Sequence, residues 1–119
     1  MPSRNRETGA SGEDAAAEAL RRAGYEILER NLRTPLGEID ILALEDEVLC
    51  FVEVKTRSST AFGHPAESVT PAKQAHLRKA AAAVIQQRRW DGPCRFDVVA
   101  VTPGADGRMD VEILPDAFQ

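Results

Sequence analysis

Apolar residues recur along this chain with two different spacings, and each spacing predicts a different kind of element. A helical spacing follows the capping-box pattern of Ser11–Asp14 and ends near Gly24. A second helix is predicted to begin at Thr70 and Pro71, which suit an N-cap and a first turn, and to stop at Gly92–Pro93. The predicted apolar stripes are Ala15, Ala16, Ala19, Leu20 and Ala23 in the first helix, and Leu77, Ala80, Ala81, Val84 and Ile85 in the second.

Runs of branched and aromatic residues bounded by turn formers predict the strands. One short strand is expected over residues 25–31, a hairpin of two strands over 37–57, and two further strands over 95–103 and 108–115. A loop rich in Ser, Gly and Pro is expected between the hairpin and the second helix, over 58–69. The order α-β-β-β-α-β-β predicts an α/β fold with a mixed five-stranded sheet flanked by helices.

The composition is that of an ordinary globular protein with a single domain. The chain has 119 residues, of which 43% are apolar and 29% charged, so we expect one domain over 11–119 after a disordered tail over 1–10. No apolar run approaches the ~20 residues of a membrane span, and the polar N-terminus does not resemble a signal peptide. These features predict a cytoplasmic protein with no membrane partner.

Charge is segregated along the chain, although the net charge is only -4. Residues 36–55 carry six acids against one base, and residues 71–96 carry six bases against one acid. A basic segment of this kind can serve a polyanionic partner such as nucleic acid. It can equally be a solvated helix face, and the sequence leaves both interpretations open.

The hairpin of 37–57 combines an apolar face with a face that carries charges. Side chains alternate along a strand, so a short loop near Asp46 and Glu47 fixes which residues lie opposite each other. The predicted opposite pairs on one face are Leu44 with Leu49, Leu42 with Phe51, Asp40 with Glu53, and Glu38 with Lys55. The other face is wholly apolar and must be covered by a helix; it consists of Ile39, Ile41, Ala43, Cys50, Val52 and Val54.

Two opposed carboxylates repel each other unless a cation lies between them. Mg²⁺ and Mn²⁺ prefer hard oxygen ligands, so Asp40 and Glu53 are candidate ligands of such an ion. A bound metal can activate water and polarise a phosphodiester, and Lys55 can position that water or offset charge on the phosphate. The alternative is a salt-bridged rim at the open end of the hairpin.

The stretch "GEID", followed after twelve residues by "EVK", resembles the core motif of PD-(D/E)XK nucleases, with Ile39 in place of its proline. The longer pattern of "GEDAAAEAL", "LERNLRTPLGEIDIL", "FVEVKTRSSTAFGHPAESV", Lys73 and "RFDVVAV" is similar to the YraN-like family of predicted bacterial endonucleases over residues 12–101. That family is similar in fold to archaeal Holliday-junction resolvases. The resemblance implies a restriction-endonuclease-like core and, by analogy, an endonuclease activity.

The resemblance also implies roles for individual residues. It makes Asp40 and Glu53 metal ligands, adds the backbone carbonyl of Val54, and gives Lys55 the part of the catalytic lysine. Glu18 matches an acid that approaches the metal from the first helix in the resolvase-like branch. Glu38 is expected to pair with Lys55 or Arg57 beside the metal.

Contacts with a substrate are expected from basic residues outside the motif, namely Arg33, Lys73 and Arg78. The expected substrate is DNA rather than RNA, at branched or processed structures, with Mg²⁺ or Mn²⁺ as cofactor. Resolvase-like nucleases make two opposed cuts, so a homodimer is expected. The alternative function is a binding module for nucleic acid or protein that keeps the nuclease fold without turnover.

Overall fold

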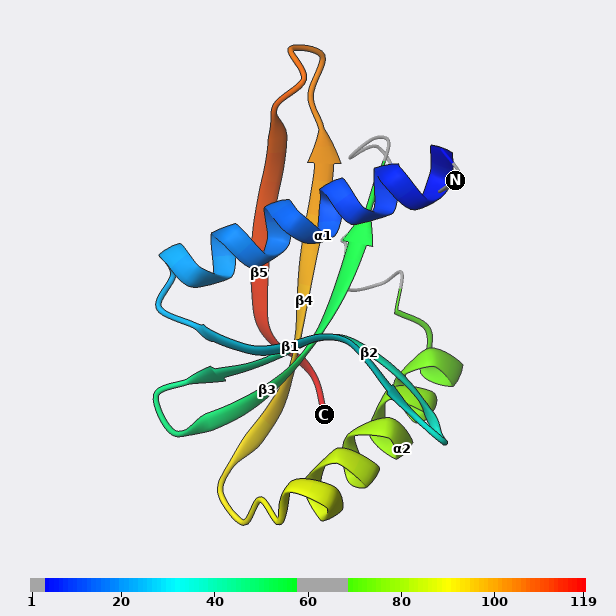
Figure 1. Cartoon of the computed structure of the whole chain (residues 1–119), viewed down its shortest axis with the longest axis vertical. Coiled ribbons are helices and arrows are strands. Elements are labelled where there is room, and N and C mark those ends of the chain that lie inside the picture. Colours follow the sequence, from blue (N-terminus) through cyan, green and yellow to red (C-terminus); the bar gives the residue numbers. More distant parts are fainter. Residues whose placement is uncertain (1–3, 58–68) are drawn as a thin grey trace.

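The computed structural model describes residues 4–57 and 69–119, with side chains from Gly12 onward. Its elements confirm the predicted order of two helices and five strands in one mixed sheet (Figure 1). They are α1 (Arg4–Arg22), β1 (Glu26–Thr34), β2 (Gly37–Glu45), β3 (Val48–Thr56), α2 (Pro71–Arg88), β4 (Cys94–Pro103) and β5 (Met109–Phe118). Most of the predicted loop over 58–69 and the first three residues of the predicted tail lie outside the described residues.

The five strands lie in the sheet in the order in which they occur in the chain. β1, β2 and β3 form an antiparallel meander, and β4 and β5 form a second antiparallel pair. The two parts meet where β3 and β4 run parallel, because α2 carries the chain back between them. Residues at the C-terminal end of β3, from Glu53 to Thr56, therefore pair with β4.

The two helices cover opposite faces of the sheet (Figure 1). α1 packs its buried residues against one set of alternating strand positions, which includes Ile41, Cys50 and Val99. α2 packs against the other set, and its buried side chains are Leu77, Ala80, Ala81 and Val84, as the helical spacing predicted. In the part of the chain that the structure describes, neither helix is long and apolar enough to cross a membrane.

The predicted helix boundaries need two corrections. α1 begins at Arg4, so the capping-box residues lie inside the helix and most of the predicted disordered tail is helical. Gly12 is buried against Thr56, and this packing accommodates a residue that local propensity would place at a cap. α2 ends at Arg88 rather than at Gly92–Pro93, because Arg89 adopts a left-handed conformation with φ 54°.

Strand β2 leaves β3 part-way along the hairpin. The predicted pairs Leu44–Leu49 and Leu42–Phe51 are confirmed, but the ladder ends at Ile41–Val52. The first residues of β2 pair only with β1, and the tip of that hairpin lies beside α2 (Figure 1). Ile39 consequently packs in the α2 cluster, whereas strict alternation predicted it on the same face as Ile41, which packs in the α1 cluster.

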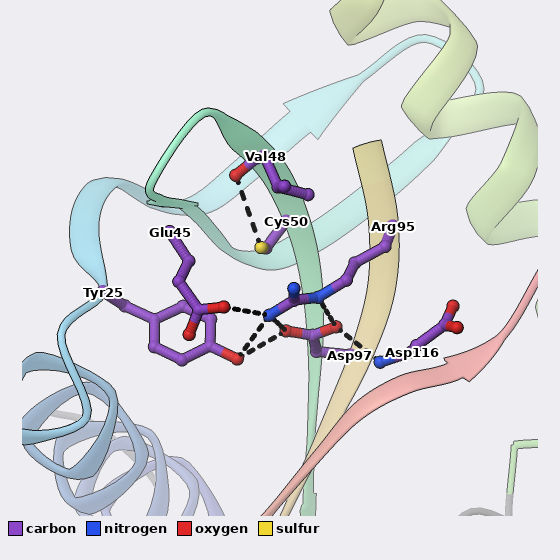
Figure 2. A network of polar contacts seen from close by, with 7 residues as sticks. All are labelled: Tyr25, Glu45, Val48, Cys50, Arg95, Asp97 and Asp116. Carbon is purple, nitrogen blue, oxygen red and sulfur yellow. Dashed lines mark hydrogen bonds and ion pairs between the residues drawn. The ribbon is translucent and has the colours of Figure 1, made fainter. Parts of the chain in front are cut away.

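A buried polar network joins β4 to Tyr25 before β1, to Glu45 at the end of β2 and to Asp116 in β5 (Figure 2). Asp97 is fully buried, and its carboxylate accepts hydrogen bonds from the Tyr25 hydroxyl at 2.8 Å, the Arg95 guanidinium at 2.8 Å and the Asp116 backbone N–H at 2.9 Å. Arg95 also reaches Glu45 at 3.0 Å. Asp97 is an acid inside an apolar strand, and these partners account for its burial.

Candidate active site

Asp40 lies at the point where β2 separates from β3. Its Oδ2 accepts a hydrogen bond of 2.8 Å from the backbone N–H of Val54. A side-chain oxygen thus takes a backbone donor of β3 just beyond the last ladder pair between the two strands. The carboxylate is thereby fixed against β3, next to Glu53.

Glu53 is nearly buried, with 7% of its side chain exposed, and its charge is balanced by Lys73. The Lys73 Nζ lies 2.7 Å from Glu53 Oε1. This hydrogen bond raises the pKa of Lys73, so the ammonium stays charged. Lys73 comes from the first turn of α2, where the Thr70 cap accepts a hydrogen bond from its backbone N–H at 3.2 Å.

These side chains line one hollow of about 420 Å³ between the β1–β2 hairpin and α2. The hollow is lined by Leu36, Gly37, Glu38, Asp40, Glu53, Lys73, His76 and Leu77. The structure therefore places Asp40 and Glu53 in the lining of one hollow, although the predicted ladder pairs Asp40–Glu53 and Glu38–Lys55 are not formed. His76, which received no role from the sequence, belongs to the same lining.

Burial and the neighbouring charge of Glu53 raise the pKa of Asp40 to about 7. A hydrogen bond with the Glu53 carboxyl acts in the same direction, while the Val54 N–H lowers the pKa. Burial, with the charge of Glu53 as the second cause, thus disfavours the ionised form of Asp40. A cation placed between the two groups would oppose this effect.

The basic residues predicted from the sequence are arranged differently from the expectation. Lys55 is half-buried in β3 and is absent from the lining of the hollow, so Lys73 is the ammonium that the structure places on the acid pair. Arg33 lies opposite Glu38 across the β1–β2 ladder and pairs with it at 2.9 Å. Glu38 therefore has Arg33 as a partner, where Lys55 or Arg57 had been expected. Arg78 donates a hydrogen bond of 2.8 Å to the backbone carbonyl of Gln119.

Glu18, the predicted helix acid, is not in the lining of the hollow. Glu18 is exposed, pairs with Arg22 at 3.2 Å and lines a separate hollow with Met109 and Val111. The charge of Glu13, by contrast, contributes to the raised pKa of Asp40. Glu13 is only 14% exposed and is held by the Arg30 guanidinium at 3.0 Å.

Glu13 lies on the buried face of α1. It precedes the buried residues Ala16, Ala17 and Leu20 by three, four and seven positions, which places all four on one helix face. Glu18 falls outside that stripe.

The donor set around the acid pair fits one type of metal. Among the described residues, no group of three or more His, Cys, Asp and Glu is placed to hold an ion. A closed cage of protein ligands, as in structural zinc sites, is therefore excluded for this part of the chain. Two adjacent carboxylates in an open hollow do fit an Mg²⁺-type ion, which keeps several waters and takes its remaining ligands from a substrate phosphate.

The sequence matches the model of the Uncharacterised protein family UPF0102 over residues 12–101. The chain belongs to this family. The match contains Asp40, Glu53, Lys73 and, from the buried network, Asp97 with its side-chain partners, so the hollow lies within the part that defines UPF0102.

Full-length relatives support the same assignment. A UPF0102 protein of Symbiobacterium thermophilum is 47% identical over 96% of this chain and 98% of its own length. A UPF0102 protein of Moorella thermoacetica is 49% identical over 99% of this chain and all of its own length. A third, from Chlorobaculum parvum, is 53% identical over 92% of this chain and 90% of its own. Their names state a family and no activity.

Proposed function

We propose that this UPF0102 protein is a metal-dependent endonuclease with a PD-(D/E)XK core that hydrolyses DNA phosphodiester bonds. The observation that carries the proposal is the pair of Asp40 and Glu53 at the fork between β2 and β3, in an open hollow with a cationic side chain. Two carboxylates held next to each other repel unless a cation lies between them.

The chain's own residues supply the frame of the reaction. Asp40 and Glu53 would hold Mg²⁺ or Mn²⁺, with the Val54 carbonyl as a further oxygen ligand. A bound ion of this type polarises the phosphodiester and makes an attacking water more acidic. The hydrogen bond from the Val54 N–H orients the Asp40 carboxylate, and Lys55 remains the predicted group that offsets charge on the phosphate.

Cleavage of a panel of DNAs tests the proposal. Linear duplex, flapped and four-way DNAs are incubated with the protein and Mn²⁺, beside an Asp40→Asn variant. We expect cleavage of at least one DNA by the wild type, with a preference for the flapped or four-way substrates, and none by the variant. Absence of cleavage of every DNA, or equal cleavage by the variant, would overturn the endonuclease proposal.

The ion pair of Lys73 with Glu53 favours a second candidate function, a binding module without turnover. In that case Lys73 is the permanent partner of Glu53 and the hollow needs no metal. Titration with Mn²⁺ separates the two functions, because a binding module has no requirement for the ion. Binding of DNA that is insensitive to Mn²⁺ and to Asp40→Asn would support the module.

A further inference from the structure

Lys73 reaches the acid pair from outside the sheet. Its side chain is 45% exposed, whereas the Glu53 carboxylate that it contacts is almost covered. The ammonium therefore closes the solvent side of the Glu53 carboxylate, and the contact of 2.7 Å uses Oε1. Asp40, the other acid, makes its fixed contact with the backbone instead.

The Lys73 ammonium competes with any divalent ion that Asp40 and Glu53 would share. Each needs a Glu53 oxygen on the open side of the hollow, and two cations at neighbouring oxygens repel each other strongly. The lysine side chain has a flexible four-carbon stem and is half exposed, so its ammonium can move without disturbing α2.

We propose that Lys73 is a resident cation that the metal displaces from Glu53, and that the released ammonium then contacts a phosphate of the substrate. The inference rests on the proposed function, because it assigns Lys73 a role at the same acid pair. It makes Lys73 a positioning residue with two partners: Glu53 before the metal binds, and the nucleic acid afterwards.

Displacement has two consequences that a merely structural salt bridge lacks. Lys73 competes with the metal, so removal of its charge strengthens metal binding. Lys73 is also available to phosphate only when metal occupies the acid pair, so its contribution to DNA affinity depends on metal. Metal and DNA therefore favour each other's binding through this side chain.

The first experiment is a calorimetric titration with Mn²⁺ in the absence of DNA. We expect Lys73→Gln to bind Mn²⁺ about tenfold or more tightly than the wild type, the scale for removal of one nearby like charge at a partly exposed site. Lys73→Arg keeps the charge and should stay near the wild type. Lys79→Gln is the matched control, because Lys79 is an exposed lysine on the same helix.

The outcomes separate the inference from the proposed function. Unchanged Mn²⁺ affinity in Lys73→Gln, with binding still abolished by Asp40→Asn, would overturn the displacement of Lys73 alone. Failure of the wild type and of Lys73→Gln to bind Mn²⁺ would overturn the metal site and the inference with it.

The second experiment measures DNA affinity by fluorescence anisotropy, once in Ca²⁺, which occupies hard oxygen sites, and once in EDTA. We expect Lys73→Gln to weaken binding of a labelled four-way DNA several-fold in Ca²⁺ and to have little effect in EDTA. Lys79→Gln should have the same effect in both conditions. An equal loss for Lys73→Gln with and without Ca²⁺ would contradict the release of the ammonium to phosphate.

Discussion

Asp40 is held between two opposing influences, and this makes it the most informative single residue of the hollow. The Val54 N–H favours its ionised form, while burial and the charge of Glu53 favour the protonated form and prevail. The raised pKa of Asp40 results from its burial and from the charge of Glu53 beside it. It links the geometry of the fork to a property that can be measured without a substrate.

The stability of the metal-free protein should therefore depend on pH through Asp40. Its pKa is about 7 in the folded chain and about 3.9 in an unfolded one, so the folded state retains a proton between these values. This contribution to stability is complete below pH 4 and is lost as the pH rises through about 7. We expect the free energy of unfolding of the wild type, relative to that of Asp40→Asn, to fall between pH 4 and 7.

Urea denaturation in EDTA at a series of pH values measures the difference. Asp46→Asn is the control, since Asp46 is an exposed acid in the turn between β2 and β3. A difference between the wild type and Asp40→Asn that does not change with pH would contradict the raised pKa.

Lys55 is expected to act in the cleavage step, whereas Lys73 is expected to act in the binding of metal and DNA. If Lys55 offsets charge that develops only in the transition state, Lys55→Ala should lower the cleavage rate by about 10²-fold or more, the scale for a positioned catalytic donor. Mn²⁺ affinity should not fall. Single-turnover rates and Mn²⁺ titrations of this variant decide the point, and a rate equal to that of the wild type would remove Lys55 from the mechanism.

The sequence predicted Asp40 and Glu53 on one face from the alternation of side chains, and both line the hollow although the ladder ends one pair before them. It could not place Lys73 on Glu53. That contact depends on where the first turn of α2 lies relative to β3, which is set by packing between residues far apart in the chain. Glu13 was missed for a different reason: the predicted apolar stripe was offset by one residue from the buried one.

At the scale of elements, the type and order of helices and strands followed from the hydrophobic pattern, whereas their ends did not. The clearest case is α1, which passes through Ser11–Asp14 because Gly12 packs directly on β3. A β carbon placed on Gly12 would lie 2.5 Å from the Thr56 hydroxyl oxygen. The close approach of α1 to β3 thus requires a glycine at position 12. Local sequence preferences could not predict this, because the contact joins residues far apart in the chain.

A double-mutant cycle tests this contact. Gly12→Ala should destabilise the protein by about 1–3 kcal/mol, the range for overpacking a filled site. In a Thr56→Ala background the same change should be neutral or stabilising, because alanine is favoured over glycine inside a helix and the nearest remaining Thr56 atom would be 3.7 Å away. Denaturant unfolding of the four proteins gives the coupling, and additive effects would contradict the contact.

At the scale of the whole molecule, the charges that are segregated in sequence meet in space. Lys73 pairs with Glu53, Arg88 with Glu29, and Arg95 with Glu45. Basic residues of the second half therefore neutralise acids of the first half. Much of the positive charge that suggested a polyanion partner is already used within the chain.

The homodimer stays a prediction. A single chain offers DNA one hollow with two carboxylates, and a second copy would supply a second site for an opposed cut. We expect a mass of about two chains, or roughly twice 13.0 kDa, by light scattering at tens of micromolar. A monomeric mass under these conditions would contradict the paired-cut arrangement.

The central claim is that Asp40 and Glu53 hold a metal that is needed to cleave DNA. The most direct measurement is the single-turnover cleavage rate of a four-way DNA as a function of Mn²⁺ concentration, for the wild type and for Asp40→Asn purified in the same way. The account predicts a rate that is absent in EDTA, rises with Mn²⁺ and saturates in the wild type, and that falls by at least about 10²-fold in the variant, which lacks a charged ligand for a hard cation. A rate in the wild type that is independent of Mn²⁺, or equal in the two proteins, would contradict it.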